Sequence, residues 1–386
     1  MKKILTTKRH IMLNTTAMGE SNDLSKLYDD VIDLSLGDTD LNTPEPIVTR
    51  AFNDALTGHT HYTDFLGDNE LREEIIKFYK NRYNVDVGLE EIMVTTSGCH
   101  GMWLVLESIL EDGDEVIIHE PYFTPYPYQI MLTRGKPIRL PTYEEEDFEV
   151  SPERLEKLIT KKTKAVIINA PNNPTGTCFQ VRTLKEILNL ALKYNFYIIA
   201  DDVYTTFSFN STFVPMASFD QGKDRIITIN SFSKKYAMTG WRIGNVIAPS
   251  NIIQVMKNIN ENNVFTAPSV SQRAAFHALR LHDTVNPPIV KETKKRLDYA
   301  YGRLSKLSKI SCSAPKGAMY LFPNIKNTGC TSQEFCRRLL EDAHVLALPG
   351  NAFGDSGEGY VRLAMSVGIP KLKEAFDRIK KMVMFL

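Results

Sequence analysis

The sequence predicts an α/β fold in which helices sandwich a mainly parallel central sheet, together with a smaller α+β domain. Two observations lead to this prediction. Short apolar runs alternate with amphipathic segments through the middle of the chain, and the last ~100 residues change to a helix-rich pattern with one short strand. Strands of a parallel sheet are expected as continuous apolar runs, because helices cover both faces of such a sheet.

Six short apolar segments are expected to form the central sheet. They are Glu91–Thr95, Glu115–His119, Ala165–Asn169, Tyr197–Asp201, Ile226–Asn230 and Asn245–Ala248. The segments between them carry helical spacing. In Arg182–Tyr194 the apolar residues at i, i+3, i+4 and i+7 are Leu184, Ile187, Leu188 and Ala191. This spacing places the four side chains on one face of a helix that packs on the sheet.

The C-terminal part is expected to form a smaller α+β domain. Its elements are helices near Lys291–Ser308 and Ser332–Asp342, a strand at Tyr360–Ala364, and a final helix that buries Leu372, Phe376 and Ile379. The TPEP stretch, Thr43–Pro46, is expected to separate an N-terminal arm from the large domain. We therefore predict an arm over residues 1–43 that packs with the small domain, a large domain over 44–285, and a small domain over 286–386.

Composition argues against several classes of protein. Lys plus Arg and Asp plus Glu number 46 each, so the net charge is zero and nucleic acid is not expected as a partner. No run approaches the roughly 18 apolar residues of a membrane span, and the opening MKKILTTKRH lacks a signal-peptide core. The five cysteines are scattered and never spaced as CxxC, which argues against disulfides or a zinc site. A cytoplasmic protein without a metal is predicted.

The most informative segment is SFSKKYAMTGWRIG, which follows an apolar run. A lysine among small residues at a strand end can form a Schiff base, because partial burial and a nearby cation keep some amine neutral. By itself, Ser-x-Lys is more often a solvated lysine, here beside Lys235. The pattern S-F-S-K-x-x-A-M-x-G-W-R-I-G around Lys234 resembles, position by position, the cofactor-attachment signature of class I and II pyridoxal-phosphate aminotransferases.

Other landmarks of that family occur in the expected order over nearly the whole chain. They are Gly37, Tyr62, Gly67, Leu71-Arg72, Ser97-Gly98-Cys99, Pro121-Tyr122-Phe123, Pro171–Gly176 (PNNPTG), Asp201–Tyr204 (DDVY), Lys234, Arg242, Pro349-Gly350 and Arg362. The resemblance implies the fold-type I architecture, pyridoxal 5′-phosphate bound by the large domain, and an amino acid and a 2-oxo acid as substrates. It also implies a ping-pong transamination.

The resemblance implies three catalytic residues. Lys234 holds the cofactor as a Schiff base and moves the proton at the substrate α-carbon. Asp201, at the end of an apolar strand, pairs with the ring nitrogen and keeps it protonated, although a helix N-cap is the structural alternative. Tyr204 places its phenol against the ring 3-oxygen, to which the amide of Asn173 also donates. The adjacent acid, Asp202, is not assigned to the ring.

The phosphate is expected at the N-terminus of the apolar helix Met102–Leu110. Ser97-Gly98-Cys99 supplies backbone donors there, and Ser231 and the guanidinium of Arg242 complete the site. A tight turn alone is the alternative for these small residues.

Two aromatic residues are assigned by the resemblance. Phe123 is expected against the cofactor ring, with a core aromatic residue as the alternative. Tyr62 is expected at the phosphate of the neighbouring subunit's cofactor. A homodimer with its sites at the subunit interface follows.

The substrate α-carboxylate is expected on Arg362. An arginine in an apolar strand needs a planar anion, and a carboxylate is its bidentate partner, with a structural salt bridge as the alternative. The resemblance adds Gly37 and Asn173 to the substrate-binding residues. Cys99 is a departure, because related aspartate enzymes carry a lysine at this position. A strict aspartate preference is therefore not expected.

Neutral or aromatic amino acids are expected to be at least as good donors as aspartate. The candidate specificity segments are Thr15–Gly19, Asp38–Leu41 and Asn262–Thr266, and the candidate apolar walls are Phe123, Tyr126 and Phe265. Two other functions stay open. One is a carbon–sulfur β-lyase on the same fold, and the other is a non-enzymatic cofactor-binding module, for which the chain lacks a basic winged-helix segment.

Overall fold

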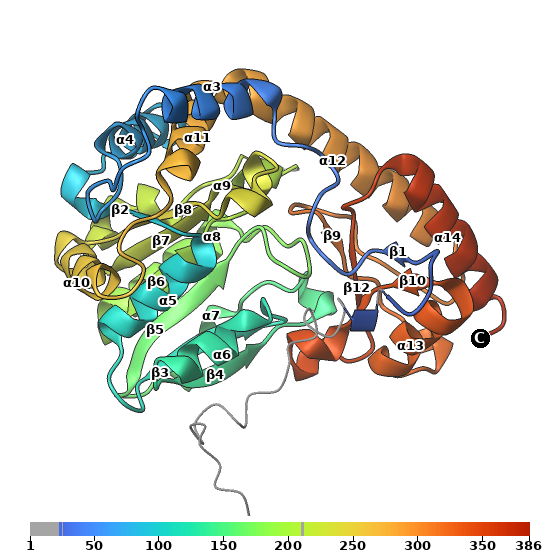
Figure 1. The fold of residues 1–386 in the computed structure, drawn as a ribbon. Coiled ribbons are helices and arrows are strands. Elements are labelled where there is room, and N and C mark those ends of the chain that lie inside the picture. The colour runs from blue at the N-terminus through green and yellow to red at the C-terminus, as the bar shows by residue number, and fades with distance from the viewer. Residues whose placement is uncertain (1–22, 25, 210–211) are drawn as a thin grey trace, which may run out of the picture.

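A computed structural model describes residues 23–24, 26–209 and 212–386, and its largest feature is a central seven-stranded sheet (Figure 1). The sheet order is β2-β8-β7-β6-β5-β3-β4. The strands are β2 (Ile92–Thr95), β3 (Glu115–Glu120), β4 (Lys136–Pro141), β5 (Thr163–Asn169), β6 (Tyr197–Asp201), β7 (Ile226–Ser231) and β8 (Gly244–Ile247). Only the two pairings of β8 are antiparallel. The predicted mainly parallel sheet is confirmed.

Helices cover both faces of this sheet. One face packs against α5 (Gly98–Ile109), α6 (Pro125–Leu132) and α10 (Ser250–Glu261), and the other against α7 (Pro152–Leu158) and α8 (Val181–Tyr194). Strand β6 serves both cores: Ile199 packs in the first, whereas Ile198 and Ala200 pack in the second. Successive side chains of a strand point to opposite faces, so an all-apolar strand belongs at the centre of such a sandwich.

The sequence pattern does not predict the seventh strand, β4. Its sequence, KPIRLP, contains two prolines, and Leu140 is the one residue of the strand that is fully buried. Proline cannot donate to a strand ladder and is confined to sheet edges. β4 is the edge strand beside β3. Its outer side pairs with no other described strand of the sheet, so prolines are accepted there.

A third helical group lies at the β2 end of the sheet. It comprises α3 (Glu45–Leu56), α4 (Asn69–Tyr83), the short α9 (Phe232–Lys235) and α11 (Ser269–Arg280). Their apolar residues share a core with Ile92 and Val94 of β2. Helix α3 begins at Glu45, inside the TPEP stretch.

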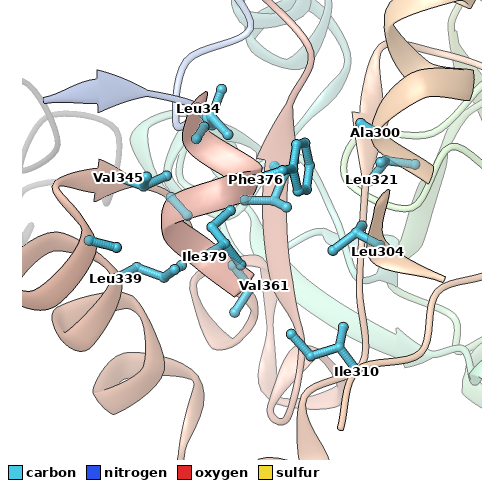
Figure 2. Packing of buried hydrophobic residues seen from close by; sticks show 14 of the residues in the cluster. Leu34, Ala300, Leu304, Ile310, Leu321, Leu339, Val345, Val361, Phe376 and Ile379 are labelled. Atoms are coloured by element: carbon cyan, nitrogen blue, oxygen red, sulfur yellow. The ribbon is translucent and has the colours of Figure 1, made fainter. Parts of the chain in front are cut away.

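The C-terminal part contains a three-stranded antiparallel sheet with the order β11-β12-β9, flanked by helices (Figure 1). Its elements are α12 (His282–Leu304), β9 (Tyr320–Leu321), α13 (Ser332–Ala343), β10 (Val345–Leu346), β11 (Leu348–Pro349), β12 (Val361–Ala364) and α14 (Ile369–Val383). From the N-terminal segment, β1 (Ile32–Asp33) pairs in parallel with β10. Leu34, Leu339, Phe376 and Ile379 meet in the shared core (Figure 2).

The domain limits at residues 43 and 285 stay predictions. Residues 1–22 and 25, and with them Thr15–Gly19, lie outside the described residues. The limit at residue 285 falls inside α12, which begins at His282 and not near Lys291 as the sequence predicts. The sequence does not predict this start because proline usually ends a helix, and Pro287 and Pro288 follow it closely. Burial of Val285 and Ile289 on either side stabilises the helix across them.

Within the described part of the chain, no helix has the length and apolar character that a membrane span requires.

The small-domain core generates a stability prediction. Phe376 is 1% exposed in that core, whereas Phe385, close to it in sequence, is 85% exposed. Phe376→Ala is expected to lower the free energy of unfolding by about 3–5 kcal/mol, because it leaves a cavity. Phe385→Ala, the matched control, is expected to change it by less than about 0.5 kcal/mol. Urea unfolding followed by circular dichroism measures both, and equal losses would contradict the packing in Figure 2.

Candidate active site

The carboxyl ends of six strands meet at one edge of the central sheet. β3, β4, β5, β6 and β7 are parallel, and β2 runs in the same direction because β8 is antiparallel to both β2 and β7. Asn169 and Asp201 are paired neighbours at the ends of β5 and β6, and Ser231 ends β7. Ligands of open α/β sheets bind at this edge.

The loops after these strands and the C-terminal part enclose a cavity of about 310 Å³. Every predicted site residue except Tyr62 lines it. These residues are Gly37, Ser97, Gly98, Cys99, Phe123, Asn173, Asp201, Tyr204, Ser231, Lys234, Arg242 and Arg362. The structure thus brings together side chains that are up to 325 residues apart, from Gly37 to Arg362.

Asp201 is a buried carboxylate in the wall of the cavity. Its Oδ2 accepts a hydrogen bond from the Tyr126 hydroxyl, and its Oδ1 accepts one from the Val203 N–H at 3.3 Å. Burial raises the pKa of Asp201 to about 6, although both hydrogen bonds act in the opposite direction. Tyr126 is therefore not the plain apolar wall that the sequence predicts, because its hydroxyl binds the carboxylate.

The neighbours of the two central residues do not line the cavity. Asp202 follows Asp201, Lys235 follows Lys234, and both are buried elsewhere. Burial raises the pKa of Asp202 well above its usual range and lowers the pKa of Lys235 to about 8. In each pair of identical residues, the first faces the cavity.

Lys234 lies between the large part of the chain and the N-terminal segment. Its Nζ donates a hydrogen bond to the Gly37 carbonyl. A Cβ added to Gly37 would meet the Tyr320 hydroxyl, so only glycine fits this close approach. The amine is held at the cavity wall by a backbone oxygen and not by a carboxylate.

Arg362 on β12 is the largest fully buried side chain of the described residues. Its Nη1 donates to Asn173 Oδ1 at 3.0 Å, its Nη2 donates to the Ser35 carbonyl, and its buried Nε has no hydrogen-bond partner in the described parts of the chain. The guanidinium lies 4.7 Å from the Tyr320 ring and 5.0 Å from the Phe353 ring. A cation held by neutral groups retains free donors for an anion.

The sequence analysis does not predict Tyr320. Its hydroxyl lies 2.7 Å from the Tyr204 hydroxyl, and its ring supports Arg362. It belongs to the two-residue strand β9, which is too short for a periodic signal. Asn169 is also missed as a site residue: its Oδ1 accepts from the Asn173 N–H at 2.9 Å and its Nδ2 donates to the Asp201 carbonyl at 3.0 Å.

The opposite end of the cavity is rich in hydrogen-bond donors. Ser97 caps α5, and the N–H groups of Gly98 and Cys99 in the first turn have no partner within the helix. Ser231 caps α9, and Arg242 donates one N–H to the Thr239 carbonyl at 2.7 Å. A helix N-terminus beside a guanidinium favours an anion at this end.

Two of the sequence expectations fall outside the cavity. Tyr62 is 81% exposed, and its ring packs edge-on against Phe265 at 4.8 Å. Phe265 does not line the cavity of its own chain either, and its role as an apolar wall stays a prediction. No residue of Asn262–Thr266 lines the cavity either, whereas Asp38 does. The described residues contain no cluster of His, Cys, Asp or Glu suited to a metal ion.

Comparison with known proteins gives a consistent result. Residues 29–379 match the family described as aminotransferase class I and II. The chain is 38% identical to an aspartate aminotransferase of Pyrococcus horikoshii, covering 98% of this chain and 97% of that one. It is 36% identical to aromatic-amino-acid aminotransferase 2 of Thermococcus litoralis, with 96% of each chain covered.

The solved structures agree with these relatives. The crystal structure of an aromatic aminotransferase from P. horikoshii superposes with a TM-score of 0.89 at 37% identity, covering 95% of this chain and 99% of that one. The family and the fold are therefore shown over nearly the full length.

The buried Asp201 generates a pH prediction for the protein freed of bound small molecules. Its pKa is about 6 in the folded chain and about 4 when unfolded, so between these values the folded state holds more protons and stability falls as pH rises. Asp201→Asn removes this titration. Its stability relative to the parent is expected to increase by about 1 kcal/mol between pH 5 and pH 7. Urea unfolding at the two pH values tests this, and a pH-independent difference would contradict it.

Proposed function

The chain belongs to the class I and II aminotransferases, and we propose that its cavity binds pyridoxal 5′-phosphate and transfers an amino group from an L-amino acid to a 2-oxo acid by a ping-pong mechanism. One observation carries the proposal for the site. In a chain of this family, Lys234, Asp201 and Arg362 line a single cavity although they come from different parts of the fold.

The residues present fit this cofactor. The N-terminus of α5 and Arg242 offer donors at one end for a phosphate, to which Ser231 adds its hydroxyl. The carboxylate of Asp201 suits a protonated ring nitrogen, and Phe123 offers an aromatic face. When bound, pyridoxal phosphate supplies an electron sink for the substrate α-carbon.

Asp201, with its neighbours, sets the protonation of the ring. Hydrogen bonds from Tyr126 and Val203 favour the charged carboxylate, and a cationic ring nitrogen favours it further. Tyr204 and Asn173 are assigned to the ring 3-oxygen. The Tyr204 hydroxyl lies 2.7 Å from the Tyr320 hydroxyl, and it donates to the ring 3-oxygen when Tyr320 acts as the donor between the two.

Lys234 would hold the cofactor covalently and move the proton at the substrate α-carbon. Its amine already lies at the cavity wall, bonded to the Gly37 carbonyl. A hydrogen bond to a backbone carbonyl is weaker than an ion pair, so the amine can leave it and turn toward a bound ligand.

Arg362 is assigned to the substrate α-carboxylate. Its unpartnered Nε supports this role, because an α-carboxylate could accept from Nε and a terminal nitrogen together. Asn173, which accepts from Nη1 at 3.0 Å, holds the guanidinium in orientation. Gly37 is assigned to the substrate by the family resemblance, and its missing side chain leaves space for the Tyr320 hydroxyl.

A homodimer with shared sites is proposed from exposed apolar residues. Leu56 is 86% exposed and Tyr62 is 81% exposed, and Phe52 and Phe265 are also exposed. Large apolar side chains that remain exposed together mark a protein interface. A second copy of the chain, which brings Tyr62 to its partner's phosphate site, accounts for this surface. The cytoplasmic location stays a prediction from the cysteine pattern.

The charges of the cavity support neutral or aromatic substrates. Its cationic residues are Lys234, Arg242 and Arg362, and each has an assigned role. Asp38, which accepts a hydrogen bond from the Thr239 hydroxyl at 2.7 Å, adds a negative charge at the exposed side. A distal carboxylate finds no free cation among these lining residues, so aspartate is expected to gain no advantage.

The adjacent lysines test the attachment site. Lys234→Ala is expected to lose covalent, borohydride-fixable attachment of the cofactor and at least about a hundredfold in transamination rate, because no amine remains to move the proton. Lys235→Met, the matched control, is expected to keep the attachment. Mass spectrometry after borohydride reduction measures it. Attachment that persists in Lys234→Ala and is lost in Lys235→Met would reverse the assignment.

Substrate preference is tested with aspartate, phenylalanine and methionine, with 2-oxoglutarate as acceptor. We expect kcat/KM for phenylalanine and methionine to equal or exceed that for aspartate. Asp38→Asn is expected to raise the aspartate value by about threefold, since an exposed charge acts weakly, and to leave phenylalanine unchanged. An aspartate preference of about a hundredfold would instead mean a cation supplied from outside this cavity lining.

A further inference from the structure

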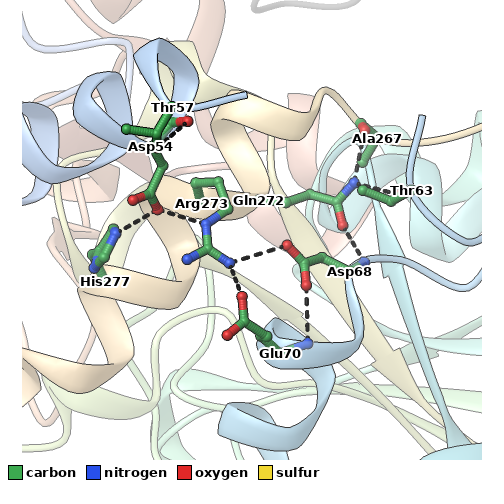
Figure 3. A network of polar contacts seen from close by, with 9 residues as sticks. All are labelled: Asp54, Thr57, Thr63, Asp68, Glu70, Ala267, Gln272, Arg273 and His277. Atoms are coloured by element: carbon green, nitrogen blue, oxygen red, sulfur yellow. Dashed lines mark hydrogen bonds and ion pairs between the residues drawn. The ribbon is translucent and has the colours of Figure 1, made fainter. Parts of the chain in front are cut away.

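A polar network away from the cavity holds the loop that carries Tyr62. The loop over residues 58–68 joins α3 to α4, and α11 packs beside it (Figure 3). Two adjacent residues of α11, Gln272 and Arg273, contact the loop and the helices on both sides of it. Neither residue belongs to the cavity lining.

Gln272 ties the two ends of the segment that follows Tyr62. Its side chain is fully buried, and its Oε1 accepts from the Asp68 N–H at 2.7 Å. Its Nε2 donates to the Thr63 hydroxyl at 3.0 Å and to the Ala267 carbonyl at 2.8 Å. The bonds to Thr63 and Asp68 therefore hold the two ends of the segment next to Tyr62, and the bond to Ala267 holds the amide itself in place.

Arg273 fixes the base of the loop. It is 5% exposed and donates to Asp54 Oδ2 at 2.6 Å, Asp68 Oδ2 at 3.3 Å and Glu70 Oε2 at 2.5 Å. His277, one turn further along α11, also contacts Asp54 at 2.7 Å. One buried guanidinium thus joins the end of α3 to the start of α4 (Figure 3). Breaking such a buried set leaves charges unpaired, so the network favours one loop position.

The backbone of the loop also leaves little freedom. The Val94 N–H donates to the Leu66 carbonyl at 2.8 Å, which attaches the loop to β2. Gly67 has a φ of +107°, and a Cβ there would lie 2.5 Å from Val94. The loop is therefore rigid up to Asp68 although Tyr62 itself is exposed.

We propose that Gln272 and Arg273 are positioning residues that act in trans: they hold the 58–68 loop so that Tyr62 reaches the phosphate site of the partner subunit. This inference rests on the proposed homodimer with shared sites. No residue of the network lines its own chain's cavity, and Tyr62, the residue it positions, is exposed and does not line that cavity either.

Hybrid dimers test the direction of this effect. A Lys234→Ala subunit is paired with a Gln272→Leu subunit, and two affinity tags isolate the hybrid. The one site with Lys234 then receives Tyr62 from a subunit with intact Gln272. Its kcat/KM and cofactor affinity are expected to equal those of an unchanged site, whereas the Gln272→Leu homodimer is expected to lose about tenfold in both.

The converse hybrid has the opposite expectation. A Lys234→Ala/Gln272→Leu subunit is paired with an unchanged subunit, so the working site receives Tyr62 from the altered loop and is expected to show the full loss of about tenfold. A loss in the first hybrid, equal losses in both, or no loss in either would overturn the proposal. Gln254→Leu, an exposed glutamine of α10, is the matched control and is expected to match the unchanged protein in both arrangements.

The same two hybrids, made with Tyr62→Phe in place of Gln272→Leu, test the shared site separately from the positioning role of Gln272. If Tyr62→Phe does not act across the interface, the shared site itself is wrong. If Tyr62→Phe acts across the interface and Gln272→Leu does not, only the positioning role fails. If Gln272→Leu yields no folded dimer, Thr63→Val removes one partner of Gln272 on the loop and is expected to act in the same direction, by about threefold.

Discussion

The common direction of six of the seven strands is the constraint on which the site depends. A parallel sheet brings every strand to its carboxyl end at one edge, so polar residues that follow separate apolar runs become neighbours. Asn169, Asp201 and Ser231 meet there because β5, β6 and β7 are adjacent and in register. β8 is antiparallel to both β7 and β2, so β2 runs in the same direction as β7. The N-terminus of α5, which follows β2, therefore lies at the same edge.

Two buried charges on different parts of the fold give the cavity its chemical character. Asp201 belongs to the central sheet and Arg362 to the C-terminal sheet, and each is held by neutral groups and not by the other. A buried ion pair would neutralise both groups and leave nothing for a ligand. Arg362 donates to Asn173 and to the Ser35 carbonyl, so the guanidinium also joins the large part of the chain to the N-terminal segment.

Sequence reasoning identifies residues whose patterns extend over many positions. The six central strands and the face of α8 follow from apolar spacing, and Lys234 follows from a long signature. Tyr320 and the hydroxyl role of Tyr126 depend on contacts between distant segments, which leave no local pattern. Strand β4 and the start of α12 are missed because prolines oppose them locally while packing decides the outcome.

Register explains why Asp201 and not Asp202 serves the site. β6 ends with Asp201 opposite Asn169 of β5 and Ile229 of β7. Side chains alternate between the faces of a strand, so a slip by one residue would bring Asp202 toward the cavity and turn every apolar side chain of β6 to the wrong core. The two hydrophobic cores on either face of the sheet therefore fix the position of the Asp201 carboxylate. The packing of the sheet and the position of the carboxylate in the site therefore depend on the same strand register.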